Sequence, residues 1–439
     1  MNRIFFTLSI ILFSFTATTS YAQNISSDIT GLTLEECLIL SLNNHHSLRK
    51  TKASAKDIEA QIESLKATQR LKVTLTGSAH YNGDYDYWHD NYHNEALNLS
   101  ATKLIYDNRK APQHNAIAAN LKASHETHRS TMISVTAETK RKYYDVVLKF
   151  LDRDLQRERV NNFEAHLESA KGLYDVGNSP YIDVTKAQAD LSSAKVSLLK
   201  ADNDILLAQE ALKIAMGTEI DGPFSIAVPK ELLLPSLPES FDSLVDVAFS
   251  DRPDLRKLMH DVTAGEHSIK DAARTNSPTV TAVASTSLSN RQHGTTDTNY
   301  YVGVNVNVPI VDGGETKAAV ERARLQLEQV HADVDALKQN ITYGVMSAAL
   351  SLLNAKDRAI AAQEAVKYSE ENLELAQGRY NVGVGNATEV SDAVSALAES
   401  KHTYYQAIYD AQTARANLDE ALGHFPQEIE GRKETWQEP

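Results

Sequence analysis

Two stretches of this chain are long enough, and free enough of helix-breaking residues, to decide most of its fold. Residues 113–171 contain neither proline nor glycine, and residues 315–377 contain a single glycine, Gly344. Each stretch therefore predicts a helix of about 60 residues, or roughly 90 Å at 1.5 Å per residue. Because isolated helices are marginal in water, we expect both to be held by packed partners.

The segment after each stretch predicts that partner. Apolar residues recur there at steps of three and four, and large residues alternate with alanine, as in closely packed coiled-coil helices. The first seam consists of Val184, Ala187, Leu191, Ala194, Leu198, Ala201, Ile205, Ala208, Leu212 and Ala215. The second consists of Val390, Ala393, Leu397, Ser400, Tyr404, Ala407, Ala411, Ala414, Leu418 and Ala421. We predict one helical hairpin per half of the chain, with turns near Gly177 and Gly383.

The two halves are copies of one unit. At a constant spacing of 206 residues, the positions that match between 167–217 and 373–423 include both turns and both seams. A register held over that length indicates a duplication. The expected units are, in order, a signal peptide over 1–22, a first repeat over 23–217, a proline-rich linker over 218–245, a second repeat over 246–423 and a tail over 424–439.

Each repeat also predicts a β-hairpin. A helical segment, 46–70 or 253–276, precedes residues in which apolar side chains alternate with small polar ones. The expected hairpins span 72–106 and 279–312. Strands with one apolar and one small polar face suit either a half-solvated sheet or a membrane barrel with a wet lumen.

The start of the chain predicts export. Asn2 and Arg3 precede an apolar run over 4–15, and Ser20-Tyr21-Ala22 fits a small-x-small cleavage site. An uncleaved membrane anchor is the alternative. Beyond Ala22, no apolar run approaches the roughly 18 to 20 residues of a spanning helix, so we expect any bilayer crossing to use strands.

Composition removes several classes of function. With 44 basic and 58 acidic residues the net charge is −14, which disfavours a nucleic-acid partner. Cys37 is the single cysteine, so no Cys-x-x-Cys motif or intramolecular disulfide exists. We expect Cys37 to be an apolar residue on a helix face.

Motifs for catalysis are missing from the sequence. We find no nucleophile elbow, zinc-protease motif or phosphate-binding glycine loop, and we predict no catalytic residues, no cofactor and no resident metal. His89 and His93, with Asp84, Asp86 and Asp90, are compatible with a metal site in an ordered loop. We expect this loop to be a solvated cell-surface loop instead.

Four strands per chain cannot close a barrel, since about eight are needed, so membrane strands would require oligomerisation. The pattern resembles the TolC-like family of outer-membrane efflux proteins. The residues that carry the resemblance are the tandem repeat, the opening Leu32-Thr33-Leu34-Glu35-Glu36, the corner Pro309-Ile310-Val311-Asp312-Gly313-Gly314, and the twin tips Tyr174-x-Val176-Gly177 and Tyr380-x-Val382-Gly383.

This resemblance implies a mainly α-helical fold with a β-barrel part. It implies a homotrimer whose pooled strands form one barrel in the outer-membrane lipid, continued by a helical barrel through the periplasm. The stretch Gly222–Pro238 would belong to an equatorial belt. Because no cysteine lies at the cleavage site, we expect no acyl chain, unlike the lipid-anchored members of the family.

The function implied is that of a passive exit duct for solutes or polypeptides delivered by an inner-membrane pump and a periplasmic adaptor protein. The alternative from another class is an exported coiled-coil scaffold or adhesin whose strands form a soluble sheet. Cell fractionation discriminates the two, because only the duct should reside in the outer membrane and need detergent.

Two sets of site residues follow. The expected adaptor-docking tips contain Tyr174, Val176, Gly177, Asn178, Tyr380, Val382, Gly383, Val384 and Gly385. Glu389 and Asp392 share a helix face, and the resemblance implies that they ring a periplasmic gate. Their first-repeat equivalents are Asp183 and Lys186. For the glycines the simpler interpretation is helix termination, and for the acids it is favourable interaction with a helix N-terminus.

Overall fold

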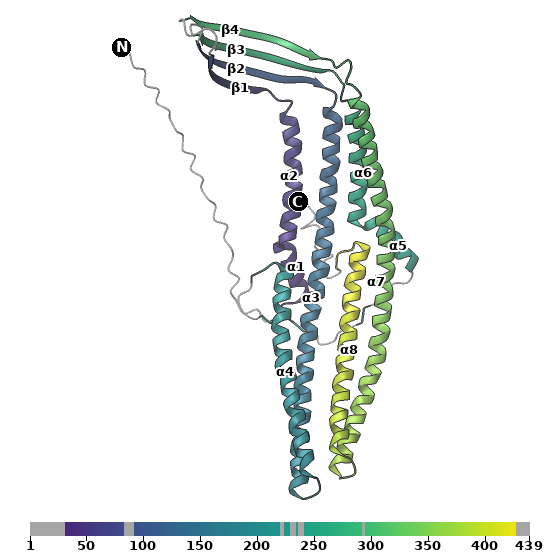
Figure 1. The fold of residues 1–439 in the computed structure, drawn as a ribbon. Coiled ribbons are helices and arrows are strands. Elements are labelled where there is room, and N and C mark those ends of the chain that lie inside the picture. The colour runs from purple at the N-terminus through teal and green to yellow at the C-terminus, as the bar shows by residue number, and fades with distance from the viewer. Residues whose placement is uncertain are drawn as a thin grey trace, which may run out of the picture.

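The computed structural model describes residues 31–82, 92–219, 224–228, 234–235, 241–291 and 295–426. Within them the chain passes twice through the same series of elements (Figure 1). The first series is α1 (Leu34–Asn44), α2 (His46–Ala67), β1 (Lys72–Asn82), β2 (Tyr92–Asp107), α3 (Lys110–Asp175) and α4 (Tyr181–Met216). The second series is α5 (Phe241–Asp251), α6 (Pro253–Ala272), β3 (Thr279–Arg291), β4 (Thr295–Asn307), α7 (Glu315–Asn381) and α8 (Ala387–Leu422).

The two longest helices, α3 and α7, contain 66 and 67 residues. At 1.5 Å per residue each is about 100 Å long. Pro112 lies in the first turn of α3, where its missing N–H breaks no helical hydrogen bond. The prediction of two very long helices is confirmed.

The helices form one layer that follows α3 and α7 (Figure 1). Near the strands the order across the layer is α2, α3, α6, α7, and at the far end it is α4, α3, α8, α7. α3 is therefore flanked on both sides along its length. α2 and α4 border one edge of the layer, and α7 borders the other.

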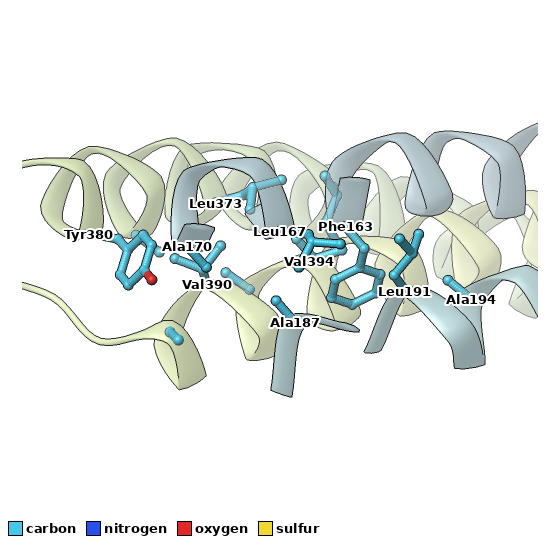
Figure 2. Packing of buried hydrophobic residues seen from close by; sticks show 14 of the residues in the cluster. Phe163, Leu167, Ala170, Ala187, Leu191, Ala194, Leu373, Tyr380, Val390 and Val394 are labelled. Carbon is cyan, nitrogen blue, oxygen red and sulfur yellow. The ribbon is translucent and has the colours of Figure 1, made fainter. Parts of the chain in front are cut away.

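The seams predicted in α4 and α8 are confirmed. Most of their alanines and large residues are buried against α3 and α7, and the alanines allow close approach of neighbouring helices. The partly buried seam positions are Val184, Leu198, Ser400, Tyr404 and Ala421. Figure 2 shows the part of this packing that lies nearest the turns. We call it the hairpin cluster, and its buried members are Val160, Phe163, Leu167, Ala170, Ala187, Leu191, Ala194, Leu373, Ala376, Tyr380, Ala387, Val390, Ala393, Val394 and Leu397.

The strands form one antiparallel sheet in the order β1-β2-β3-β4. A bulge between Leu104 and Tyr106 lengthens β2 relative to β3. The second hairpin was expected to reach residue 312, but β4 ends at Asn307. Pro309 follows two residues later and has no N–H to donate to a strand partner, which explains the earlier end.

An Ile-x-Asp motif marks the corner between strand and long helix in both halves, as Ile105-x-Asp107 and as Ile310-x-Asp312. Asp107 Oδ1 accepts a hydrogen bond of 2.9 Å from the backbone N–H of Arg109. Asp312 accepts from the N–H groups of Gly314 and Thr316, at 3.0 and 2.8 Å. The hydrogen bonds from Thr316 and Gly314 hold the pKa of the Asp312 carboxyl far below its usual range. Both aspartates thus satisfy N–H groups at a helix start.

The first described residues lie against the linker between the repeats. Leu32 and Ile226 form a parallel bridge, with Leu32 N donating to Ser225 O at 3.0 Å and Ala227 N to Leu32 O at 2.9 Å. In α1, Cys37 is fully buried. Burial raises the pKa of its thiol to about 12, so Cys37 is an inert packing residue, as predicted.

Some sequence predictions lie outside the described residues. They are the signal peptide, the acidic loop residues around His89, most of the proline-rich linker and all but the first residues of the tail. The side chain of His93 is likewise outside the description.

Candidate functional site

The sheet has two chemically different faces. One row across the four strands is Val73, Ala101, Ala284 and Val302. Another row, with the opposite parity, is Thr76, Asn98, Ser287 and Asn299. Since neighbouring residues of a strand point to opposite sides, one face is apolar and the other is small and polar.

The apolar face is exposed in the single chain. Figure 1 shows the sheet beyond the ends of the helices, and in the described part of the chain no helix packs broadly on it. Large apolar side chains on this face remain exposed, among them Leu75 at 62% and Val302 at 79%. Apolar surface of this extent indicates contact with lipid or with another chain. The strands are also long enough, at 11 to 16 residues, to cross a bilayer at a tilt.

Both the sheet and the helix layer have open edges. β1 and β4 each lack a second neighbouring strand in the described chain. The edge helices α4 and α7 carry exposed large apolar residues along their length. These residues are Tyr181, Ile182, Val196, Leu199, Leu206, Leu207 and Ile214 on α4, and Leu325, Tyr343, Leu350, Ile360, Tyr368 and Leu375 on α7.

The first hairpin ends in a tight turn after α3. Gly177 has φ 77°, a left-handed conformation that L side chains rarely adopt. Its N–H donates to Tyr174 O at 2.9 Å, and Asn178 N donates to Leu173 O at 2.8 Å. This pattern of two backward hydrogen bonds terminates the helix. The turn leaves Val176 exposed at the end of the molecule.

The second turn repeats this geometry with one more hydrogen bond. Gly383 has φ 75°, and its N–H donates to Tyr380 O at 3.0 Å. The N–H groups of Val384 and Gly385 both donate to Arg379 O, at 3.0 and 2.9 Å. A Cβ on Gly385 would lie 3.0 Å from the backbone N of Tyr380, so this position has little space for a side chain.

The two tyrosines of the tips have different surroundings. Tyr174 is exposed and its ring lies 5.4 Å from that of Tyr181. Tyr380 is only 4% exposed and belongs to the hairpin cluster (Figure 2). Sequence matching made them equivalent, whereas the structure makes Tyr174 a surface residue and Tyr380 a core residue.

Glu389 and Asp392 lie on exposed positions at the start of α8. The N–H of Glu389 donates to Asn386 Oδ1 at 2.9 Å, so the acid occupies the first turn of a capped helix. Glu389 Oε2 also lies 3.5 Å from Arg379 Nε at the end of α7. The structure thus keeps both acids at the turn, and it pairs one of them with a cation.

Contacts between the two hairpins were missed at the sequence level. Near the turns Lys186 Nζ donates to Thr388 Oγ1 and Ser169 Oγ to Asn381 Oδ1, both at 2.9 Å. Ser391 Oγ donates to Asp190 Oδ2. Each contact joins residues about 200 positions apart, and no local pattern in the sequence could have revealed them.

Two other kinds of feature are absent from the residues that the structure describes. Among the helices described, none combines the length and apolarity that a membrane-spanning helix needs. The described ranges contain no cluster of three or more potential metal ligands from His, Cys, Asp and Glu.

Comparison with known proteins identifies the family. The model of the outer membrane efflux protein family matches residues 38–218 and matches again over residues 244–424. The chain belongs to the outer membrane efflux protein family. The two matches correspond to the two halves of the chain, and they confirm the resemblance and the outer-membrane location predicted from the sequence. This efflux protein has a mainly helical fold with four strands in the residues that the structure describes.

Individual relatives are distant but cover most of this efflux protein. It is 22% identical over 391 residues to the probable outer membrane lipoprotein SilC of Salmonella typhimurium, which covers 87% of this chain and 84% of the relative. It is 23% identical over 420 residues to the outer membrane efflux protein BepC of Brucella suis biovar 1, covering 94% and 89%. The crystal structure of CusC matches with a TM-score of 0.76 at 19% identity, covering 89% of this chain and 92% of that one.

Proposed function

We propose that this outer membrane efflux protein is the passive exit duct of a tripartite efflux or secretion system. Three copies would form one outer-membrane β-barrel and one long helical barrel through the periplasm. An inner-membrane pump supplies the energy, and a periplasmic adaptor protein connects pump and duct. Solutes or polypeptides leave through the lumen, and the duct itself catalyses no reaction.

The arrangement of open edges carries this proposal. On one side each chain offers β1, α2 and α4, and on the other it offers β4 and α7 (Figure 1). An exposed edge strand is not viable in lipid, because its N–H and C=O groups lack partners. Joining the first side of one chain to the second side of the next satisfies both edges and closes a ring. Three chains of four strands give twelve, more than the about eight that a barrel needs.

The side chains support the same arrangement. The exposed apolar residues of α4 and α7 lie on the edges that would meet in the ring. The apolar sheet face would contact lipid, and the row with Thr76 and Asn98 would face a water-filled lumen.

We further propose roles for the two hairpin tips and for the two acids that follow the second tip. The exposed tip residues would dock the adaptor, namely Tyr174, Val176, Asn178, Val382 and Val384. Gly177, Gly383 and Gly385 would shape the turns, and Tyr380 would support them from the core. Glu389 and Asp392 would ring the periplasmic constriction. We also propose that the chain consists of two repeats joined by an equatorial linker over 218–245.

Detergent extraction and reconstitution test the duct. We expect the purified protein to have the mass of a trimer and to form single conducting pores in planar bilayers. Leu199→Asp places a charge at an exposed apolar position of the α4 edge and should lower the trimer fraction, while Lys200→Glu, one residue away and already polar, should not. A stable water-soluble monomer would contradict the trimeric duct.

A further inference from the structure

A histidine is buried inside the contact between the two hairpins. His166 of α3 is 5% exposed, and its Nε2 atom has no hydrogen-bond partner among the described residues. Its ring centroid lies 5.1 Å from that of Tyr380, which α7 contributes to the hairpin cluster. A buried polar atom without a hydrogen-bond partner destabilises the packed arrangement.

The charged surroundings of His166 come from α4. Asp190 and Asp183 are the negative groups, and Lys186 is the positive one. Both acids already accept hydrogen bonds from serines, Asp190 from Ser391 of α8 and Asp183 from Ser179, the latter at 2.5 Å.

From α7 the neutral phenol ring of Tyr380 packs near His166. From α8 comes the hydroxyl of Ser391, which is bonded to Asp190. Burial outweighs the attraction of the two acids, so the pKa of His166 is lowered from its usual value. The neutral imidazole is consequently the form that fits between the packed hairpins.

We propose that His166 is a proton sensor whose protonation loosens the contact between the two hairpins and eases opening of the periplasmic end of the duct. This inference rests on the proposed function, since it assigns a trigger to the same channel. The hydrogen bonds Lys186–Thr388 and Ser169–Asn381 lie in the same contact and would break together with it.

The sign of the pH effect follows from linkage. When the hairpins separate, His166 becomes hydrated and its pKa returns toward about 6.5. Acid therefore stabilises the separated arrangement, which binds the proton more tightly. Between the two pKa values the ratio of separated to packed hairpins rises by up to about tenfold per pH unit for each chain. In a trimer that opens in concert, the factors from the three chains multiply.

The first test measures the proton on His166 itself. Hydrogen–deuterium exchange at the imidazole C2 position, followed by mass spectrometry of the peptide that contains His166, reports its titration midpoint in the intact detergent-solubilised protein. We expect a midpoint below about 6.5. A midpoint at or above that value would overturn the proposal, whether or not the protein conducts.

The second test measures opening. In planar bilayers, the open probability of the wild type should rise between pH 7.5 and pH 5.5 by about tenfold or more. His166→Gln, or His166→Leu if the glutamine variant fails to assemble, should remove this rise. His331→Gln, at an exposed position of α7, should keep it. All these variants retain Glu389 and Asp392, so titration of the acids is held constant.

The possible outcomes separate the two proposals. A protein that forms no pore at any pH contradicts the duct. Pores whose opening does not depend on pH, or depends on it equally in His166→Gln, contradict the sensor and leave the duct intact.

Discussion

The two hairpin tips share a backbone and differ in their charges. At both tips a glycine with φ near 76° ends a long helix, with its N–H bonded to the carbonyl of a tyrosine three residues earlier. After the turns the side chains diverge. Asp183 accepts from Ser179, and Lys186 reaches across to Thr388 of the other hairpin. At the second tip, Glu389 pairs with Arg379.

This difference shows which residue the turn conformation requires and which side chains can vary between the two copies. The left-handed turn needs glycine, so duplication left that position unchanged in both copies. Among the charged residues that follow, Glu389 and Asp392 are exposed and Asp183 and Lys186 are partly exposed, so packing sets few limits on them. Substitutions of the charged residues at the second tip should therefore affect function, and substitutions of the glycines should affect stability.

The largest effect should come from charges placed on the tips. Asn178→Glu and Val384→Glu each put a carboxylate on an exposed docking position. If the adaptor contacts both tips, each substitution should abolish export, while trimer and outer-membrane levels stay normal because neither side chain packs in the core. Export of a pump substrate from intact cells, with immunoblots of outer-membrane fractions, measures both quantities.

Ser192→Glu is the matched control, since Ser192 is exposed on α4 at a distance from the turn. It should leave export unchanged. Loss of export in only one tip variant would show that the adaptor distinguishes the hairpins, and wild-type export in both would exclude docking at the tips.

The parts of the fold that were predictable are those with a local signal. The seam of α4 repeats every three or four residues, so its buried face could be read directly, and Leu191 and Ala194 lie in the core as expected. The same holds for the turns, because few residues besides glycine tolerate φ near 76°.

What could not be predicted depends on contacts between distant segments. Tyr174 and Tyr380 look equivalent in the repeat, yet α8 packs against α3 and only the second tyrosine becomes buried. The ion pair of Glu389 with Arg379 and the burial of His166 likewise depend on how the helices are placed side by side. A periodic pattern predicts which face of a helix is buried, but it does not predict which residue of another helix lies against that face.

A smaller effect, several-fold rather than complete, should come from the acid pair. Glu389→Ala/Asp392→Ala removes two carboxylates per chain, or six in the proposed trimer, so preference for cations and block by divalent cations should both fall about three- to tenfold. Because Arg379 offsets the charge of Glu389, Asp392→Ala alone should have more effect than Glu389→Ala alone. Reversal potentials and single-channel block in planar bilayers measure these changes.

The corresponding change in the first hairpin is the control. Asp183→Ala should alter selectivity less, because Lys186 lies one turn away and opposes its charge. Arg379→Ala should act in the opposite direction and strengthen the cation preference. If selectivity and block are unchanged in the double variant, these acids do not line the constriction.

The smallest effect, and the one that tests the shared part of the tips, concerns the glycines. Alanine at position 177 or 383 finds open space but must adopt φ near 76°, which costs roughly 1–2 kcal/mol. Gly172 and Gly378 are the matched controls, since each lies a few residues earlier in the helix, without positive φ and with no atom near the added Cβ. Alanine there should stabilise the helix by about 0.5–1 kcal/mol, because glycine is the poorer helix former.

The two sets should shift the unfolding midpoint of the detergent-solubilised protein in opposite directions, by similar amounts in the two repeats. If Gly383→Ala also reduced export far more than Gly177→Ala did at equal stability, the second glycine would do more than end a helix.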